Sequence, residues 1–219
     1  LELAYKRPFR AYRSQYGSRE IDYARLLAGL FSLSGEPQYL EKAVEASQKA
    51  VENFSAADLL SRIAESYWEM AKSRSLLGQH MEASESFKHA SENYEKAAEK
   101  IPQLKDCYKE YASYMRAWSE IEKARQRHAE RDYGAAGKHY EKAAELHKAT
   151  ARWNYLQPSY TAWAQLEKAE DLSRREETEE ARDLFQQAAE LFTKAKRTIE
   201  AKLKEVNVTE ERNMAVELA

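Results

Sequence analysis

Cysteine is almost missing from this sequence, because Cys107 is the only one among 219 residues. A single cysteine excludes the internal disulfide framework that small secreted domains use for stability. The first twelve residues carry Lys6, Arg7 and Arg10 where a secretory signal peptide has its apolar segment. These observations favour a reducing compartment, and we expect a cytoplasmic location.

Glycine, proline and long apolar runs are also scarce. Six glycines and four prolines leave few turns, and a charged fraction of 33% favours surface-rich helices over strands. The mean hydropathy is −0.84 and no long apolar run occurs, so no transmembrane segment is expected. The net charge of −2 lacks the basic excess of a typical nucleic-acid-binding protein. We therefore expect no nucleic acid as the main partner.

The residue patterns that carry most enzyme chemistry are absent from the sequence as well. The six glycines form neither of the common Gly-rich phosphate-binding patterns. The five histidines include no His-Glu-x-x-His pair, and none follows an acidic residue by three positions, as in di-iron helical bundles. We therefore expect no catalytic residue, no metal and no cofactor, and a protein that is not an enzyme.

The sequence does contain one pattern in three copies: an alanine, then after twelve residues Ala-x3-aromatic-x2-Ala. The copies are Ala71, Ala83, Phe87 and Ala90; Ala124, Ala136, Tyr140 and Ala143; and Ala169, Ala181, Phe185 and Ala188. A degenerate earlier copy has Phe31 as its leading residue and Ser47 in place of the ring. Self-similarity of this kind is typical of helical repeat arrays.

The spacing within each copy predicts a helical hairpin. Alanine, ring and alanine at i, i+4 and i+7 lie on one stripe of a helix, where small residues let a neighbouring helix approach and the ring fills the groove. Polar triplets at 78–80, 131–133 and 176–178 can end one helix and begin the next. We expect an all-α fold of about four antiparallel hairpins and about nine helices, the last capped by Thr209.

Local signals predict where individual helices begin and end. Pro8 and Gly17 are expected to interrupt any long helix before one that runs over residues 21–33. Ser55 is expected to cap a helix that reaches residue 77. Asp132 is expected to cap a helix over residues 133–156, which the Pro158 segment then separates from the next helix.

The pattern resembles the tetratricopeptide repeat, most closely in the segment Leu77-Gly78-x4-Ala83-x3-Phe87-x2-Ala90. The resemblance covers roughly residues 24–203 and implies a right-handed α-solenoid. The copies are longer than the family's repeats of about 34 residues, and Pro102 and Pro158 come later than the family's closing proline. Both departures indicate lengthened second helices, as in SNAP-type adaptors, which have similar long hairpins of alanine and aromatic residues.

Three regions are expected along the chain. Residues 1–19 form a basic and aromatic arm or the edge of a fragment, residues 20–204 the repeat domain, and residues 205–219 a linker with a truncated helix. Because the sequence does not begin with Met and ends in an apolar stretch, we expect a piece of a longer protein. The candidate basic residues are Lys6, Arg7, Arg10 and Arg13. They indicate either an arm that binds RNA, acidic lipid or a protein, or a segment packed on the first hairpin.

Large aromatic residues gather on the first helices of the hairpins, which line the concave face in arrays of this kind. The candidate partner-binding residues are Trp68, Tyr111, Tyr114, Arg116, Trp118 and Trp163. They either form a groove for a peptide or partner helix, or fill the core between hairpins.

These observations lead to a functional expectation. We expect a noncatalytic protein–protein interaction scaffold that binds a protein or peptide partner. The alternative is a regulatory or membrane-adaptor module, similar to SNAP adaptors, that senses a ligand or partner.

Overall fold

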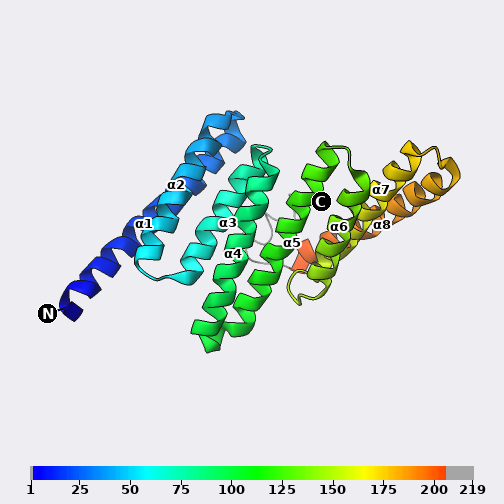
Figure 1. The fold of residues 1–219 in the computed structure, drawn as a ribbon. Helices are drawn as coiled ribbons and strands as arrows, with labels where there is room; N and C mark the ends of the chain where they lie inside the picture. The colour runs from blue at the N-terminus through cyan, green and yellow to red at the C-terminus, as the bar shows by residue number, and fades with distance from the viewer. Residues whose placement is uncertain (1, 206–219) are drawn as a thin grey trace. The chain divides into compact units, whose positions relative to one another are not determined.

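The computed structural model describes residues 2–205, and their side chains from Pro8 to Lys204. Within this range the chain forms eight α-helices and two short 3₁₀ helices, and no strand (Figure 1). The helices are α1 (Glu2–Ser34), α2 (Pro37–Ala56), α3 (Leu60–Leu76), α4 (His80–Lys100), η1 (Pro102–Leu104), α5 (Lys105–Ala129), α6 (Tyr133–Lys148), η2 (Asn154–Leu156), α7 (Gln157–Arg174) and α8 (Thr178–Glu205). The all-α prediction is confirmed. The expected ninth helix, at Thr209, lies outside the described residues.

The helices belong to two compact units, and the boundary between the units falls inside α5, after Glu122. In the first unit α1 packs on α2, α2 on α3 and α3 on α4. The first part of α5 joins this unit, and there the hydroxyl of Ser91 donates to the carbonyl oxygen of Ala112 at 2.9 Å. In the second unit α6 and α8 both pack on α7. Each helix therefore contacts the helix that precedes or follows it in the sequence.

The repeated alanine-and-ring stripe lies in the interior. All nine alanines of the three copies are buried. Phe87 and Tyr140 are buried as well, and Phe185 is half-buried. Because small residues alternate with rings along this stripe, neighbouring helices can approach closely on either side of each ring. The predicted helical hairpins are confirmed.

Three of the hairpin turns share one backbone conformation at the same repeat position. Gly78, Arg131 and Glu176 each follow the leading alanine of their copy by seven, and their φ angles are 73°, 62° and 63°. In each turn the N–H of the next residue donates to the carbonyl five positions earlier, at 2.9, 2.9 and 3.1 Å. This bond satisfies a carbonyl that the end of the helix would leave without a partner. As predicted, Asp132 caps the following helix, accepting from the N–H of Ala135 at 3.1 Å.

The break expected at Pro8 and Gly17 is wrong, because α1 runs without interruption through both residues. Gly17 is buried, and a Cβ placed on it would lie 2.8 Å from the ring of Phe54. Glycine is therefore needed here so that the ring of α2 can approach the backbone of α1 closely. Packing of this kind outweighs the low helix propensity of glycine.

Two other predicted helix boundaries, one start and one end, are wrong for local reasons. Ser55 does not begin a helix, because α2 continues to Ala56 and α3 begins at Leu60 after Asp58, whose φ is 55°. The helix after Asp132 ends at Lys148, not near residue 156. There the hydroxyl of Thr150 donates to the carbonyl of His147 at 2.8 Å and accepts from the N–H of Trp153 at 3.3 Å. These bonds compete with helical ones and end the helix.

Candidate functional site

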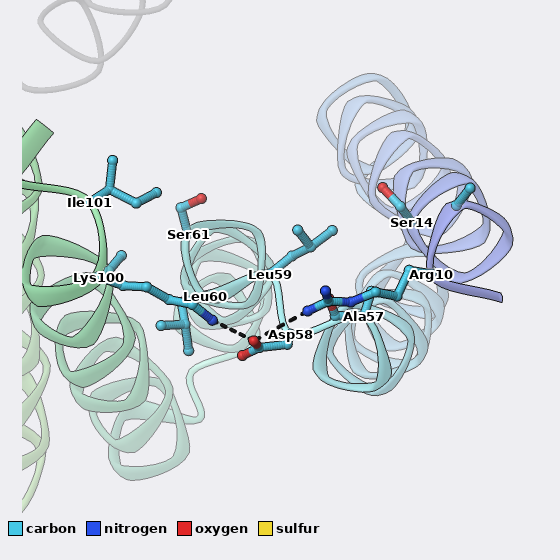
Figure 2. Close-up of a pocket in the computed structure, with 11 residues that line it drawn as sticks. Arg10, Ser14, Ala57, Asp58, Leu59, Leu60, Ser61, Lys100 and Ile101 are labelled. Atoms are coloured by element: carbon cyan, nitrogen blue, oxygen red, sulfur yellow. Dashed lines mark hydrogen bonds and ion pairs between the residues drawn. The ribbon is translucent and has the colours of Figure 1, made fainter. Parts of the chain in front are cut away.

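A cleft of about 710 Å³ opens in the first unit, where the ends of three helices meet (Figure 2). One wall comes from α1, with Arg10 and Ser14, and the opposite wall comes from the end of α4, with Lys100 and the adjoining Ile101. The floor is the segment from the α2–α3 turn into α3, residues 57–61. The cleft therefore combines apolar side chains with charged groups from segments more than forty residues apart in the sequence.

Asp58 lies between two basic side chains in this cleft (Figure 2). The Nη2 of Arg10 lies 3.3 Å from its Oδ2, and the Nζ of Lys100 donates to the same oxygen. Arg10 also donates from Nε to the carbonyl oxygen of Ala57 at 3.2 Å. The hydrogen bond and charge of Lys100, with the charge of Arg10, lower the pKa of Asp58. One carboxylate between two cations leaves the cleft with a single excess positive charge.

The basic arm expected at the N-terminus is part of α1 wherever its side chains are described. Arg10 lines the cleft, and Arg13 donates from Nη1 to the side-chain oxygen of Asn53 on α2 at 3.0 Å. The guanidinium of Arg13 also lies over the ring of Phe9, 5.2 Å from its centroid. The side chains of Lys6 and Arg7 lie outside the described residues.

Most of the candidate aromatic residues form one cluster inside the first unit. Trp68 of α3 lies against Tyr111 and Tyr114 of α5, with ring centroids 6.2 and 5.9 Å apart. Trp118 stacks on Phe87 of α4 at 5.9 Å. Tyr114 and Phe87 are buried, and Trp68, Tyr111 and Trp118 are partly buried. These rings fill the space between α3, α4 and α5, which is what the core interpretation of the sequence predicts.

The two remaining candidates are more exposed. The guanidinium of Arg116 lies on the surface of α5, where its Nη1 is 3.1 Å from Glu95 of α4. Trp163 of α7 belongs to the second unit and is 39% exposed. It stacks on Tyr140 at 5.9 Å and meets Phe192 edge-on at 5.2 Å. Trp163 therefore packs against two rings while part of its surface remains exposed to solvent.

Each copy of the repeat also buries one glutamate, two positions before its leading alanine. These are Glu69, Glu122 and Glu167, with 9%, 0% and 1% exposure. Glu69 accepts from the Nε of Arg25 at 3.0 Å. Glu122 accepts from the hydroxyl of Ser75 at 2.8 Å and lies 2.8 Å from the Nδ1 of His80. Each buried carboxylate thus meets a polar or basic group of the preceding hairpin.

The same contact recurs in the next copy. His128 and Ser75 occupy equivalent positions, four residues after their leading alanines, and the Nδ1 of His128 lies 2.9 Å from Glu167. Burial raises the pKa of Glu167, although the charge and hydrogen bond of His128 oppose that change. The sequence already displayed these glutamates at a fixed repeat position, which was the signal that could have revealed them.

The second unit also buries His147, which follows the ring Tyr140 by seven and stacks on Tyr160 with centroids 5.2 Å apart. Burial lowers the pKa of His147 to about 3. Among the described side chains, no group of three or more His, Cys, Asp or Glu residues is placed to hold a metal ion. In residues 2–205 no helix is both long and apolar enough to cross a membrane.

Comparisons of this chain with protein families, with curated proteins and with solved structures found no match.

Proposed function

We propose that this chain is a noncatalytic protein-interaction scaffold, built as a right-handed solenoid of hairpins like that of tetratricopeptide repeats. The recurrence of one contact at equivalent positions, Ser75 with Glu122 and His128 with Glu167, is the observation that carries this proposal. Such recurrence is expected when each hairpin docks on the previous one in the same way. The buried carboxylates of Glu69, Glu122 and Glu167 are spaced along the repeat, one at the same position of each copy.

The cleft around Asp58 is the proposed binding site for a peptide partner. Arg10 and Lys100 each bond Asp58, yet about half of each of these two side chains faces solvent. Their remaining donors are available to an acidic side chain of a ligand, which forms charge-assisted hydrogen bonds with both cations. Leu59, Leu60 and Ile101 provide apolar lining next to them. The cleft therefore suits a peptide that carries an acidic residue beside an aliphatic one.

Selection from a random peptide library displayed on phage, followed by fluorescence anisotropy with the intact chain, tests this function. We expect selected peptides to be rich in Asp or Glu beside Leu, Ile or Val. Lys100→Ala should weaken binding about tenfold, since it removes a charge-assisted hydrogen bond. Lys88→Ala is a matched control, because Lys88 lies on the same helix, is 53% exposed and pairs with Glu85 at 3.2 Å. It should change the affinity less than twofold.

Two results would count against this function. One is a library that yields no peptide with a dissociation constant below about 1 mM. The other is a selected peptide that binds the Lys100→Ala and Lys88→Ala variants as tightly as the original chain.

A further inference from the structure

The outer face of α1 carries a row of exposed apolar side chains, which we call the α1 stripe. Its first half is aromatic, with Phe9, Tyr12 and Tyr16 exposed by 48%, 57% and 43%. Its second half is mainly leucine: Tyr23, Leu26, Leu30 and Leu33 are exposed by 49%, 60%, 37% and 87%. A different side of α1 packs on the rest of the unit through Ile21, Ala24 and Leu27, all buried. The α1 stripe is thus separate from the face that holds α1 in the fold.

The spacing of the α1 stripe identifies the kind of partner that it fits. Its residues recur alternately three and four positions apart from Phe9 to Leu33, with Arg19 at the one charged position. This is a period of 3.5 residues, the a and d pattern of a helix that pairs with a second helix along its length. At 1.5 Å per residue the α1 stripe is about 36 Å long. The surface therefore suits a helix of similar length.

We propose that the partner helix is α1 of a second copy of this chain, in antiparallel orientation about a two-fold axis. In that arrangement Phe9 of one copy faces Leu33 of the other, Tyr12 faces Leu30, and Tyr16 faces Leu26. Three of the four rings, Phe9, Tyr12 and Tyr16, then pack on leucine, which fills the interface evenly. A parallel pair would place each of the four rings on its own equivalent and each leucine on a leucine.

The charged position of the α1 stripe favours the same orientation. In the antiparallel pair Arg19 faces Tyr23 of the other copy, where a guanidinium can lie over the ring. The carboxylate of the other copy's Asp22, whose side chain is 74% exposed, comes next to it. In a parallel pair Arg19 would face Arg19, and two like charges would lose solvent together. The antiparallel arrangement is therefore complementary in charge as well as in shape.

The exposed area is sufficient for a dimer. With about 200 Å² for a whole aromatic side chain, the seven apolar residues leave on the order of 700 Å² exposed in each copy. Specific interfaces bury about 800 Å² on each partner, and apolar patches of this size usually mark interaction sites. We expect a dissociation constant on the order of 10 µM.

Sedimentation equilibrium of the full chain between 1 and 100 µM tests this proposal. The mass should rise from 25.4 kDa towards twice that value. Leu26→Glu places a charge opposite the other copy's Tyr16 and should raise the dimer dissociation constant at least tenfold. Leu76→Glu is the matched control, because Leu76 of α3 is 59% exposed and lies off the α1 stripe. It should leave the constant within twofold.

A second variant keeps the test decisive if Leu26→Glu disturbs folding. Leu33 is 87% exposed, so Leu33→Glu should leave the circular dichroism spectrum unchanged while it weakens the dimer. A chain that stays monomeric at 100 µM would overturn the proposal and assign the α1 stripe to a different protein. A dimer that Leu26→Glu and Leu33→Glu leave intact would overturn it equally.

Disulfide trapping tests the orientation of the pair. Because Cys107 is the only cysteine, Cys107→Ser provides a cysteine-free background. Chains carrying Arg19→Cys and chains carrying Tyr23→Cys are mixed in equal amounts and oxidised mildly. The antiparallel pair predicts mainly the mixed disulfide between the two kinds of chain. A predominance of disulfides between two Arg19→Cys chains would show a parallel pair and overturn the arrangement.

Discussion

The hydroxyl of Ser75 donates to the carboxylate of Glu122 at 2.8 Å, and Glu122 is fully buried between the two hairpins that this bond joins. The equivalent residues of the next copy, His128 and Glu167, repeat the contact, with Nδ1 of His128 2.9 Å from the carboxylate. A buried carboxylate is costly unless it is paired and hydrogen-bonded. Each of these two contacts therefore gives a buried carboxylate a polar partner.

Neutralising Glu167 should change how stability depends on pH. Burial raises the pKa of this carboxyl above its ordinary value of 4.5, so the folded chain binds the proton more tightly than the unfolded chain. Stability from this group therefore falls as the pH rises from 4.5 through the raised pKa. The free energy of unfolding of Glu167→Gln, minus that of the original chain, should therefore increase as the pH rises from 4 to 7. Urea unfolding at four pH values measures this, and a constant difference would contradict the prediction.

His147 should give a pH dependence of the opposite sign. Its pKa is lowered from 6.5 to about 3 by burial, so the unfolded chain takes up the proton first as the pH falls. Stability is retained above pH 6.5 and lost below it, by up to about 1.4 kcal/mol per pH unit for one proton. His147→Phe keeps a ring against Tyr160 and should remove this loss. If the free energy of unfolding falls as steeply in the variant as in the original chain between pH 6 and 4.5, burial of His147 does not cause the loss of stability in acid.

Glycine destabilises the interior of a helix, but it should stabilise the fold at turn positions whose φ is positive. Arg131 has a φ of 62°, a conformation that costs a residue with a Cβ about 1 kcal/mol. Arg131→Gly should therefore raise the free energy of unfolding by about 0.5–1 kcal/mol, whereas Gly78→Ala should lower it by about 1 kcal/mol. Lys138→Gly, at an exposed position inside α6, is the control and should cost about 1 kcal/mol. Loss of stability in Arg131→Gly would show that another contact holds this turn.

The sequence predicted the hairpins well because their spacing reflects packing directly. Alanine and ring at fixed intervals define one buried stripe. A short polar turn ends each helix, and a cap such as Asp132 begins the next one. The buried Glu122 and Glu167 were also visible at a constant repeat position, but a single charged residue on a helix looks the same whether solvent or a neighbouring hairpin covers it.

Other features depended on contacts between distant segments. Gly17 suggested a helix break, yet its role is to admit the ring of Phe54 from another helix. The cleft needed Arg10, Asp58 and Lys100 to converge from α1, the α2–α3 turn and the end of α4. No local pattern connects these residues, because the helix packing alone brings them together.

The most direct test of the proposed function is to map a selected peptide onto the intact chain by nuclear magnetic resonance of backbone amides. Shift changes are recorded as the peptide is added to isotope-labelled protein, first for the original chain and then for Lys100→Ala. The proposed scaffold function predicts the largest changes at Arg10, Asp58 and Ile101, and much smaller ones in the variant. Changes confined to residues around Trp163, or equal changes in both proteins, would contradict the assignment of this cleft as the binding site.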